Sequence, residues 1–370
     1  MGRAPDLTGS ASHVPTTRYT DPDFLDAELQ LLQKSWAFAG LSGDLPRPGS
    51  YATLRLGEED ILLTRDAAGA AHAFRNICQH RGVVLAEGAG AAESIDCPYH
   101  GWVYELDGRL RGVPRPEGFD RLDRRAAGLI RLPLREQAGL LWVSRAAADH
   151  ALSDWLGDIP ERLSPYALEQ MRPIQVADWT LPANWKVALE QAIDFYHVPT
   201  VHKSLVPHIA SEPEMHTLGA HNLQTLPIKT SSKMRQWLDD ACSRAGPYTD
   251  AQRSQLQKFF IFPNLVLNAM PYHFTVMQFW PEGTDRCRLH YRFCERSGAR
   301  GFEKLRATAS WLASRYILYE DVRLLPRIRR GHAQASTLQQ PLHHHERAVA
   351  HFHATLGASV GTAQGLRSQR

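Results

Sequence analysis

The chain has 370 residues, 43% of them hydrophobic, which is enough to build the cores of two ordinary domains and excludes a wholly disordered protein. Lys and Arg number 42 against 39 Asp and Glu, and this balance argues against a nucleic-acid-binding or membrane-surface protein. The N-terminus is polar and no apolar stretch reaches membrane-spanning length, which predicts a cytoplasmic protein. The odd number of cysteines, five, predicts that there is no disulfide framework.

The first part of the chain combines a helical start with short β-like runs. Asp21-Pro22-Asp23 opens a helical pattern that passes through Trp36 and ends near Gly40. After Gly43 the pattern changes to strand-like runs bounded by Gly and Pro, among them Tyr51–Leu56, Asp60–Thr64 and Leu140–Val143. We therefore expect residues 1–42 to form a helical segment that packs on the second domain, and residues 43–145 to form a mostly antiparallel β-domain.

The second predicted domain, residues 146–370, mixes helices and strands. Helical patterns cover about Trp185–Tyr196, Lys233–Lys258 and Gly301–Arg330, with Pro- and His-rich loops over Val198–Leu226. Strand-like runs occur at Phe259–Asn268, His273–Trp280 and Arg288–Cys294. Because the strands and helices do not alternate as βαβ units, the whole chain is predicted to be α+β, with an antiparallel sheet in this domain.

Two Cys–His pairs form the strongest motif. Cys78-Gln-His80-Arg-Gly82 is followed, after residues 81–96, by Cys97-Pro-Tyr-His100-Gly101. Two thiolates and two imidazoles suit either a structural zinc ion or a Rieske [2Fe–2S] cluster, in which two histidines replace two cysteines on one iron. Each loop here supplies one ligand of each kind, and this mixture favours the Rieske cluster. The glycines allow tight turns next to the ligands.

A second metal-binding pattern lies in the segment from Asn184 to His202. Two histidines and a carboxylate with open coordination positions form the facial triad of non-haem Fe(II) enzymes. His197 and His202 do not share one face of a regular helix, so we expect Pro199 to break the helix and turn the chain back. The third ligand would come from Glu320 or Asp321 in the long C-terminal helix, and helical periodicity does not choose between them.

Together these motifs resemble the Rieske non-haem iron oxygenases, in their large catalytic (α) subunit, a group that includes ring-hydroxylating dioxygenases and choline- and carnitine-monooxygenase-like enzymes. The resemblance extends from about Trp36 to Phe352. It implies an N-terminal Rieske domain and a catalytic domain of the helix-grip type. It also implies roles for eight residues: Cys78, His80, Cys97 and His100 hold the [2Fe–2S] cluster, His197, His202 and Asp321 hold mononuclear Fe(II), and Asp194 carries electrons between the two centres.

The resemblance further implies a terminal oxygenase that uses O₂ on a small organic substrate. Because the chain has no dinucleotide or flavin fingerprint, NAD(P)H would act only through a separate reductase or ferredoxin. The expected reaction is monohydroxylation or oxidative N- or O-demethylation by a homotrimer. The alternatives are an aromatic-ring cis-dihydroxylating dioxygenase, a Rieske-type electron carrier without oxygenase activity, and a zinc-stabilised binding protein.

Several other residues are given simpler interpretations. Glu320 is expected to be exposed or paired with an arginine, and the run His343–His345 to lie in a solvated loop. Gln191 stands where the family commonly has Asn. Cys287 and Cys294 are expected to be packing residues. The arginines between Arg109 and Arg125 are expected to form a solvated face or, alternatively, a docking surface for an acidic ferredoxin or flavin reductase.

Overall fold

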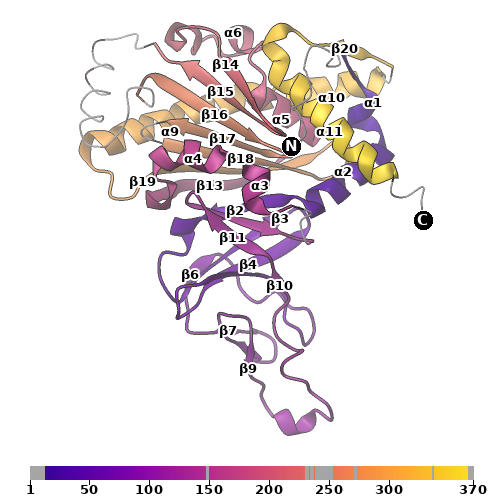
Figure 1. Ribbon diagram of the computed structural model, residues 1–370, viewed down its shortest axis with the longest axis vertical. Helices are drawn as coiled ribbons and strands as arrows, with labels where there is room; N and C mark the ends of the chain where they lie inside the picture. The colour runs from indigo at the N-terminus through magenta and orange to yellow at the C-terminus, as the bar shows by residue number, and fades with distance from the viewer. Residues whose placement is uncertain are drawn as a thin grey trace. The chain divides into compact units, whose positions relative to one another are not determined.

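The computed structural model describes residues 13–146, 150–229, 233, 237, 253–270, 273–335 and 337–365. Its internal contacts divide the chain into two compact units, drawn in Figure 1. One unit comprises Gln33–Trp155 and Ala167–Gln170. The other comprises Met1–Leu32, Leu156–Tyr166 and Met171–Arg370. We call them the β unit and the sheet–helix unit.

The described part of the β unit consists of short antiparallel strands in three sheets. Their orders are β10-β5-β4-β3-β6, β11-β12-β2 and β7-β8-β9. The strands are β2 (Trp36–Leu41), β3 (Ser50–Leu56), β4 (Glu59–Arg65), β5 (Ala71–Arg75), β6 (Ala89–Ala91), β7 (Ile95–Asp96), β8 (Val103–Tyr104), β9 (Leu110–Gly112), β10 (Arg131–Leu132), β11 (Leu134–Gln137) and β12 (Leu140–Ser144). Short helices are α3 (Leu152–Leu156), η2 (Ser42–Asp44), η3 (Pro116–Gly118) and η5 (Leu168–Gln170).

The helical pattern expected to continue to Gly40 is wrong beyond Lys34. Helix α2 ends at Lys34, and Trp36–Leu41 forms strand β2, which pairs antiparallel with β12. Every residue of β2 is buried. A short continuous apolar run is compatible with a strand covered on both faces as well as with a buried helix, so periodicity alone does not separate the two.

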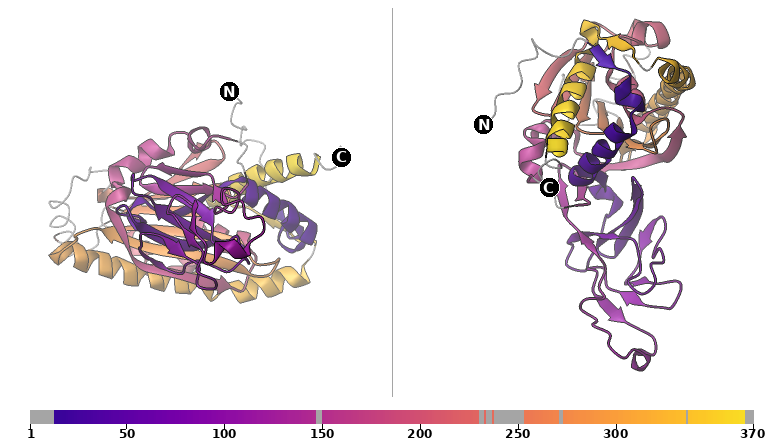
Figure 2. Two further views of the ribbon diagram at one scale, coloured as in Figure 1. Left: turned by 90° about the horizontal axis from the view of Figure 1, so that it is seen from below. Right: turned by 90° about the vertical axis from the view of Figure 1, so that its right-hand side faces the viewer.

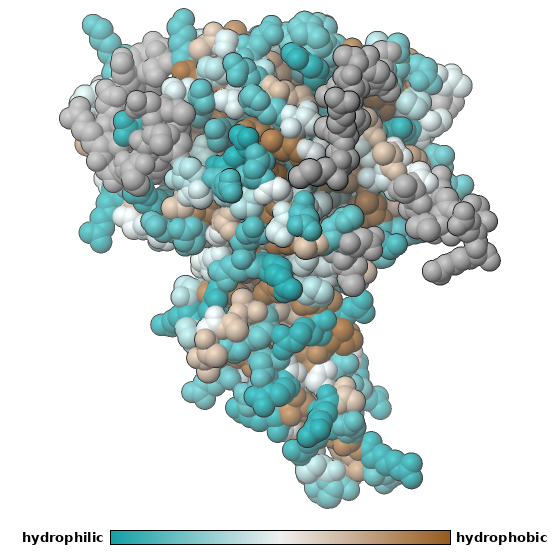
Figure 3. Space-filling model, in the orientation of Figure 1, coloured by the Kyte–Doolittle hydropathy of each residue, from teal (hydrophilic) through white to brown (hydrophobic). Residues whose placement is uncertain are grey.

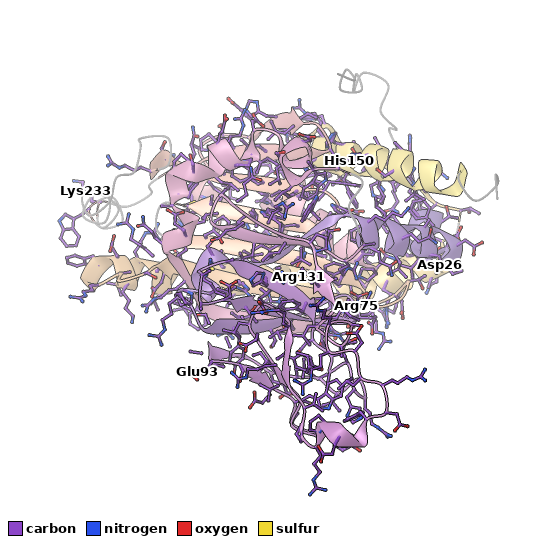
Figure 4. All side chains as sticks on the ribbon, turned by 60° about the horizontal axis from the view of Figure 1, so that its bottom comes forward. Asp26, Arg75, Glu93, Arg131, His150 and Lys233 are labelled. Carbon is purple, nitrogen blue, oxygen red and sulfur yellow. The ribbon has the colours of Figure 1, made fainter. Side chains whose placement is uncertain are left out.

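Two arginines of the β unit, Arg75 and Arg131, lie in strands outside the basic stretch. Figure 4 shows Arg75 and Arg131, which belong to the adjacent strands β5 and β10. Arg131 donates to Nδ1 of His72 and to the carbonyl of Asp107, both at 2.6 Å. The Asp107 carboxylate in turn accepts a hydrogen bond from Nε of Arg109 at 2.6 Å. The arginines of the basic stretch, at positions 109, 111, 115, 121, 124 and 125, are all exposed, as expected for a solvated face.

The sheet–helix unit is built on a seven-stranded antiparallel sheet in the order β13-β19-β18-β17-β16-β15-β14. Its strands are β13 (Met171–Leu181), β14 (Glu214–Leu218), β15 (His221–Pro227), β16 (Gln255–Ile261), β17 (Leu265–Met270), β18 (His273–Pro281) and β19 (Cys287–Arg296), and a separate pair joins β1 (His13–Pro15) to β20 (Gln339–Pro341). Its described helices are α1 (Thr17–Thr20), α2 (Pro22–Lys34), α4 (Ile159–Leu163), α5 (Trp185–Ile193), α6 (Val198–Val201), α9 (Gly301–Val322), α10 (Leu325–Gln334), α11 (Arg347–Gly365), η4 (Ser164–Tyr166), η6 (Val206–His208) and η7 (His344–Glu346).

Helix α5 packs on the strands β17–β19, and α11 packs on α5. The rings of Trp185 and Phe352 meet edge to face at 5.8 Å in this layer. Helix α9 extends along the sheet, as Figures 1 and 2 show. The predicted packing cysteines Cys287 and Cys294 are fully buried in β19, which confirms their interpretation.

The N-terminal helix α2 is amphipathic and is joined to α5 by a buried ion pair. Asp26 on α2 is exposed and points outward (Figure 4). Glu28, two residues later, is fully buried, and its Oε1 lies 2.7 Å from Nζ of Lys186. Its Oε2 accepts a hydrogen bond from Nε1 of Trp185 at 2.8 Å. Because two buried charges tolerate no loss of a partner, this pair fixes α2 against α5.

Several predicted elements of this unit need correction. The run Phe259–Asn268 is not one strand, because the chain reverses between β16 and β17 at Phe262–Asn264. Strands β13, β14 and β15 were not predicted, and the last two replace part of the loop expected over Val198–Leu226. Residues 255–258 of the helix predicted over Lys233–Lys258 belong to β16, and residues 234–236 and 238–252 of it lie outside the described residues.

Hydrophilic side chains cover most of the face seen in Figure 3, with smaller hydrophobic areas between them. In the described residues, no helix combines the length and the apolar character required to cross a bilayer.

Candidate metal centres

The two Cys–His loops of the β unit have the same backbone design. The amides of Cys78 and Cys97 donate to the carbonyls of Val83 and Trp102, at 2.8 and 2.7 Å. The glycine amides in each loop donate back to the cysteine carbonyls, at 2.9 and 3.1 Å. These glycines, at positions 82 and 101, have φ angles of +73° and +68°, a conformation that glycine adopts without steric strain. The predicted tight turns beside the cysteines and histidines are confirmed.

The thiols and imidazoles of these loops lie at different depths. Cys78 and Cys97 are 2% and 4% exposed and belong to one hydrophobic cluster, whereas His100 is exposed and His80 is half-buried. The imidazole rings of His80 and His100 have centroids 4.6 Å apart. Nδ1 of His80 is buried without a hydrogen-bond partner. This donor set fits a [2Fe–2S] cluster with a buried thiolate-bound iron and an imidazole-bound iron near the surface.

Neighbouring aromatic side chains contact His80 and Cys78 in these loops. The ring of His80 stacks on Trp102 at a centroid distance of 5.0 Å, which fixes its orientation. Burial, together with the neighbouring side chains of His100 and Arg81, lowers the pKa of His80, which favours the neutral imidazole that binds metals. The hydroxyl of Tyr104 lies 3.4 Å from Sγ of Cys78, a contact that the sequence analysis missed.

The second predicted set, in the sheet–helix unit, converges on one point. Nε2 of His197 and Nε2 of His202 are 3.2 Å apart. Oδ1 of Asp321 lies 3.0 Å from Nε2 of His202 and 3.5 Å from Nε2 of His197. This oxygen is buried and has no hydrogen bond of acceptable geometry. Two imidazole nitrogens and a carboxylate oxygen that face one another fit a divalent cation with open coordination positions.

Each histidine of this set is held from behind by a carboxylate. Oδ2 of Asp194 lies 2.8 Å from Nδ1 of His197, and Oε2 of Glu320 lies 2.9 Å from Nδ1 of His202. Such pairing fixes each ring and directs its Nε2 toward the point where His197, His202 and Asp321 meet. Glu320 is 7% exposed, so the expectation of an exposed or arginine-paired charge is wrong. A Glu and an Asp that are adjacent on a helix can both serve one site when one binds and the other orients a ligand.

Charges around His202 also suit a cation. Burial lowers the pKa of the His202 imidazole, but the neighbouring carboxylates of Asp321 and Glu320 outweigh burial and raise it. The same negative field favours a bound metal ion over an empty site.

The local backbone differs from the prediction in a way that explains the geometry. Helix α5 begins at the N-cap Asn184, whose side chain accepts from the amide of Lys186 at 3.0 Å, and ends at Ile193. Asp194 already has an extended backbone. Pro199 was expected to break the helix, and this expectation is wrong. The residue lies in the first turn of the short helix α6, where its missing N–H is tolerated.

The C-terminal helix expected over Gly301–Arg330 is interrupted in the same region. Helix α9 ends at Val322, one residue after Asp321, and α10 begins at Leu325 with a proline in its first turn. The break places Asp321 in the last turn of α9. The side chain of Gln191 donates to the backbone carbonyl of Asp321 at 3.3 Å, so this departure from the family pattern contacts the site.

A cavity of about 540 Å³ adjoins this set and includes Asp321 in its wall. Its volume lies within the range of small-molecule sites. Phe195 and Val198, which flank His197 in the sequence, also line it. The aromatic residues Phe259, Phe260, Phe262 and Trp280 are buried and do not line the cavity, so they fill the core.

The run His343–His345 is not a solvated loop. It enters η7, and His343 and His345 are half-buried. The ring of His343 stacks on Tyr196 at 4.2 Å, and Nε2 of His345 lies 2.7 Å from Oε1 of Glu212. The run is therefore packed against the loop that carries Asp194.

Comparison with protein-family models gives two matches. Residues 35–124 match the Rieske [2Fe-2S] domain, and residues 161–362 match the ring hydroxylating alpha subunit (catalytic domain). The second match covers more than half of the chain.

Among curated proteins, the chain is similar to choline monooxygenase of Spinacia oleracea, with 30% identity over 302 residues, 77% of this chain and 64% of that protein. It is also similar to the glycine betaine monooxygenase oxygenase subunit of Chromohalobacter salexigens, with 33% identity over 195 residues, 52% of this chain and 44% of that protein. The matched stretch therefore spans less than two thirds of each of these two relatives.

Solved structures support the fold. A quaternary ammonium Rieske monooxygenase superposes with a TM-score of 0.81 at 22% identity, covering 94% of this chain and 95% of that chain. Naphthalene 1,2-dioxygenase from Rhodococcus superposes with a TM-score of 0.78 at 21% identity, covering 96% of both chains. The predicted α+β fold, an antiparallel Rieske domain followed by a catalytic domain, is confirmed.

Proposed function

The chain belongs to the ring-hydroxylating alpha-subunit family of Rieske oxygenases, and on this basis we propose that it is the terminal oxygenase component of such a system. The observation that carries the proposal is the convergence of His197, His202 and Asp321, with ligand atoms 3.0 to 3.5 Å apart, beside a cavity large enough for an organic substrate. In this family the cluster supplies electrons singly and the mononuclear iron activates O₂.

The residues have distinct roles in this proposal. Cys78, Cys97, His80 and His100 hold the [2Fe–2S] cluster. His197, His202 and Asp321 hold the Fe(II), with Glu320 orienting His202.

Asp194 orients His197 and carries electrons toward it. One of its oxygens lies 2.8 Å from Nδ1 of His197, and the other accepts from the amide of Tyr196 at 2.6 Å. This places a charged hydrogen-bonding group directly behind the ring that faces the metal position.

The proposed assembly follows from the division of the reaction between an electron-accepting cluster and an O₂-activating iron. Electrons come from NAD(P)H through a separate reductase or ferredoxin, and a cytoplasmic homotrimer lets the cluster of one subunit serve the iron of the next. The cluster function is assigned to residues 43–145 and catalysis to residues 146–370. Of the N-terminal residues 1–42, expected as one helical segment on the catalytic domain, residues 13–32 belong to the sheet–helix unit, whereas residues 33–42, with strand β2, belong to the β unit.

The favoured reaction is monohydroxylation or oxidative N- or O-demethylation, because the matched curated relatives are monooxygenases. The second candidate is cis-dihydroxylation of an aromatic ring, which the apolar cavity also admits. The test is turnover with a generic reductase, NADH and O₂, following product mass. Gain of one oxygen or loss of a methyl group supports the first reaction, and a diol supports the second. If both metal sites are filled and O₂ consumption still does not depend on substrate, the proposal is contradicted.

A further inference from the structure

The last two carbonyls of helix α5 are held by side chains that come from the sheet. A helix leaves its final carbonyls without partners inside the helix. Nζ of Lys258 donates to the carbonyl of Ala192 at 2.5 Å. Nε2 of Gln224 donates to the carbonyl of Ile193, where the helix ends, at 2.7 Å. The end of α5 therefore receives two hydrogen bonds from outside the helix, and one of the donors is an ammonium group, which also suits the negative end of the helix dipole.

Neighbouring strands place these two donors side by side. Gln224 in β15 and Lys258 in β16 are directly paired in the antiparallel register. Directly paired residues project from the same face of a sheet, so both side chains reach α5 from one side. Gln224 is 6% exposed, so little water competes for its hydrogen bond. The pairing of β15 with β16 thus fixes two successive carbonyls of the helix at once.

The residue that follows these carbonyls is Asp194, and its backbone is extended. Its Oδ2 lies 2.8 Å from Nδ1 of His197, and its Oδ1 accepts from the amide of Tyr196 at 2.6 Å. Because Asp194 is the first residue outside the helix, the direction of its side chain depends on where α5 ends. A shift of that end by one residue would change this backbone conformation and, with it, the direction of the carboxylate.

The same end of α5 is also joined to the third proposed ligand. The side chain of Gln191 donates to the backbone carbonyl of Asp321 at 3.3 Å. Residues 191–193, the last three of the helix, are therefore hydrogen-bonded to α9, β16 and β15. A displacement of this helix end would be transmitted both to Asp194 and to Asp321.

The charge of Lys258 has the opposite effect on a bound metal. Burial lowers the pKa of this ammonium group more than the charges of Asp321 and Asp194 raise it. An ammonium group that interacts with these carboxylates also repels a divalent cation that Asp321 holds. By its charge alone, Lys258 would weaken Fe(II) binding, whereas by holding Asp194 in place it would strengthen Fe(II) binding. The sign of a change in Fe(II) affinity therefore distinguishes the two effects.

We propose that Lys258 and Gln224 are positioning residues for the mononuclear metal site. They fix the point at which α5 ends, and they thereby hold the carboxylate of Asp194 behind His197. They act through the backbone of α5. This inference rests on the proposed function, which makes His197 a ligand of Fe(II) and Asp194 the carboxylate that orients it.

The test is equilibrium dialysis of Fe(II) against protein stripped of its mononuclear iron, with the cluster left intact. Lys258→Met should lower the affinity about tenfold, the lower end of the range for loss of an orienting partner. Lys258→Gln, which keeps a hydrogen-bond donor without the charge, should lie between the parent and Lys258→Met. Gln224→Leu should also lower the affinity, and it keeps the inference testable if Lys258→Met does not fold. The control is Lys304→Met, the same change at an exposed position of α9.

A double-mutant cycle with Asp194→Ala shows whether Lys258 acts through Asp194. If it does, adding Lys258→Met to Asp194→Ala should lower Fe(II) affinity by about twofold or less beyond the single Asp194 change. The free energy of unfolding by denaturant is measured on the same variants. A merely structural role would lower that free energy and leave the Fe(II) affinity of the folded protein unchanged.

Unchanged or tighter Fe(II) binding in Lys258→Met would overturn the inference, because the first result shows no positioning and the second shows an effect of charge alone. Full additivity of the losses in the cycle would overturn it as well. Either result, with the parent binding Fe(II), leaves the proposed function intact. A parent protein that binds no Fe(II) refutes the proposed function itself.

Discussion

Replacement of Glu320 by Ala is expected to weaken Fe(II) binding although Glu320 is not a proposed ligand. Its Oε2 lies 2.9 Å from Nδ1 of His202, and both side chains are buried. Loss of such an orienting carboxylate typically lowers metal affinity about 10- to 100-fold, or about 1.4 to 2.8 kcal/mol. Water has little access to the vacated position, so Nδ1 of His202 would keep no equivalent partner.

The assay is equilibrium dialysis of Fe(II) against protein stripped of its mononuclear iron, with the cluster left intact. The control is Glu214→Ala, because the Glu214 side chain is 78% exposed on β14 and does not line the cavity. Asp321→Ala should show a larger loss than Glu320→Ala, since it removes a proposed ligand. Equal Fe(II) affinity in the parent and Glu320→Ala would refute the orienting role.

Three further changes test other parts of the account. In Asp194→Asn, both metal centres should still fill and dithionite should still reduce the cluster. Turnover should nevertheless fall by orders of magnitude, because the charge behind His197 is lost. Near-normal turnover would show that electrons reach the iron by another path. In Cys97→Ala the visible absorption of the cluster should disappear, since a missing thiolate has no substitute; retained colour would show that Cys97 is not a ligand. In Lys186→Met the free energy of unfolding by denaturant should fall by about 3 to 5 kcal/mol, because Glu28 is left charged and buried. Arg162→Met, which breaks the exposed pair with Asp158, should change it by about 1 kcal/mol or less.

The sequence predicted the metal-binding motifs better than the backbone that carries them. The Cys–His loops were predictable because their chemistry and their turn glycines are contiguous. The meeting of Asp321 with His197 and His202 was implied by a family resemblance and not by periodicity, because the stripe that contains Asp321 and the stripe that contains Glu320 are both largely apolar.

The errors have physical causes. The buried strand β2 has a continuous apolar sequence that carries no period of its own, so a helical pattern was extended into it. The role of Glu320 depends on where α9 ends and how His202 turns back, and both are tertiary features. Gln191 contacts Asp321 across 130 residues, and Tyr104, although close to His100 in sequence, contacts Cys78 in the other loop 26 residues away, so no local pattern could have indicated these contacts.

The most direct test of the central claim is the iron content of the parent and of Asp321→Ala, with the electron paramagnetic resonance of the reduced cluster measured on the same samples. We expect about three irons per chain in the parent, of which two belong to the cluster. Asp321→Ala should lose one iron and keep the cluster signal unchanged. Zinc in place of iron at the Cys–His loops, or a full iron count in Asp321→Ala, would contradict the account.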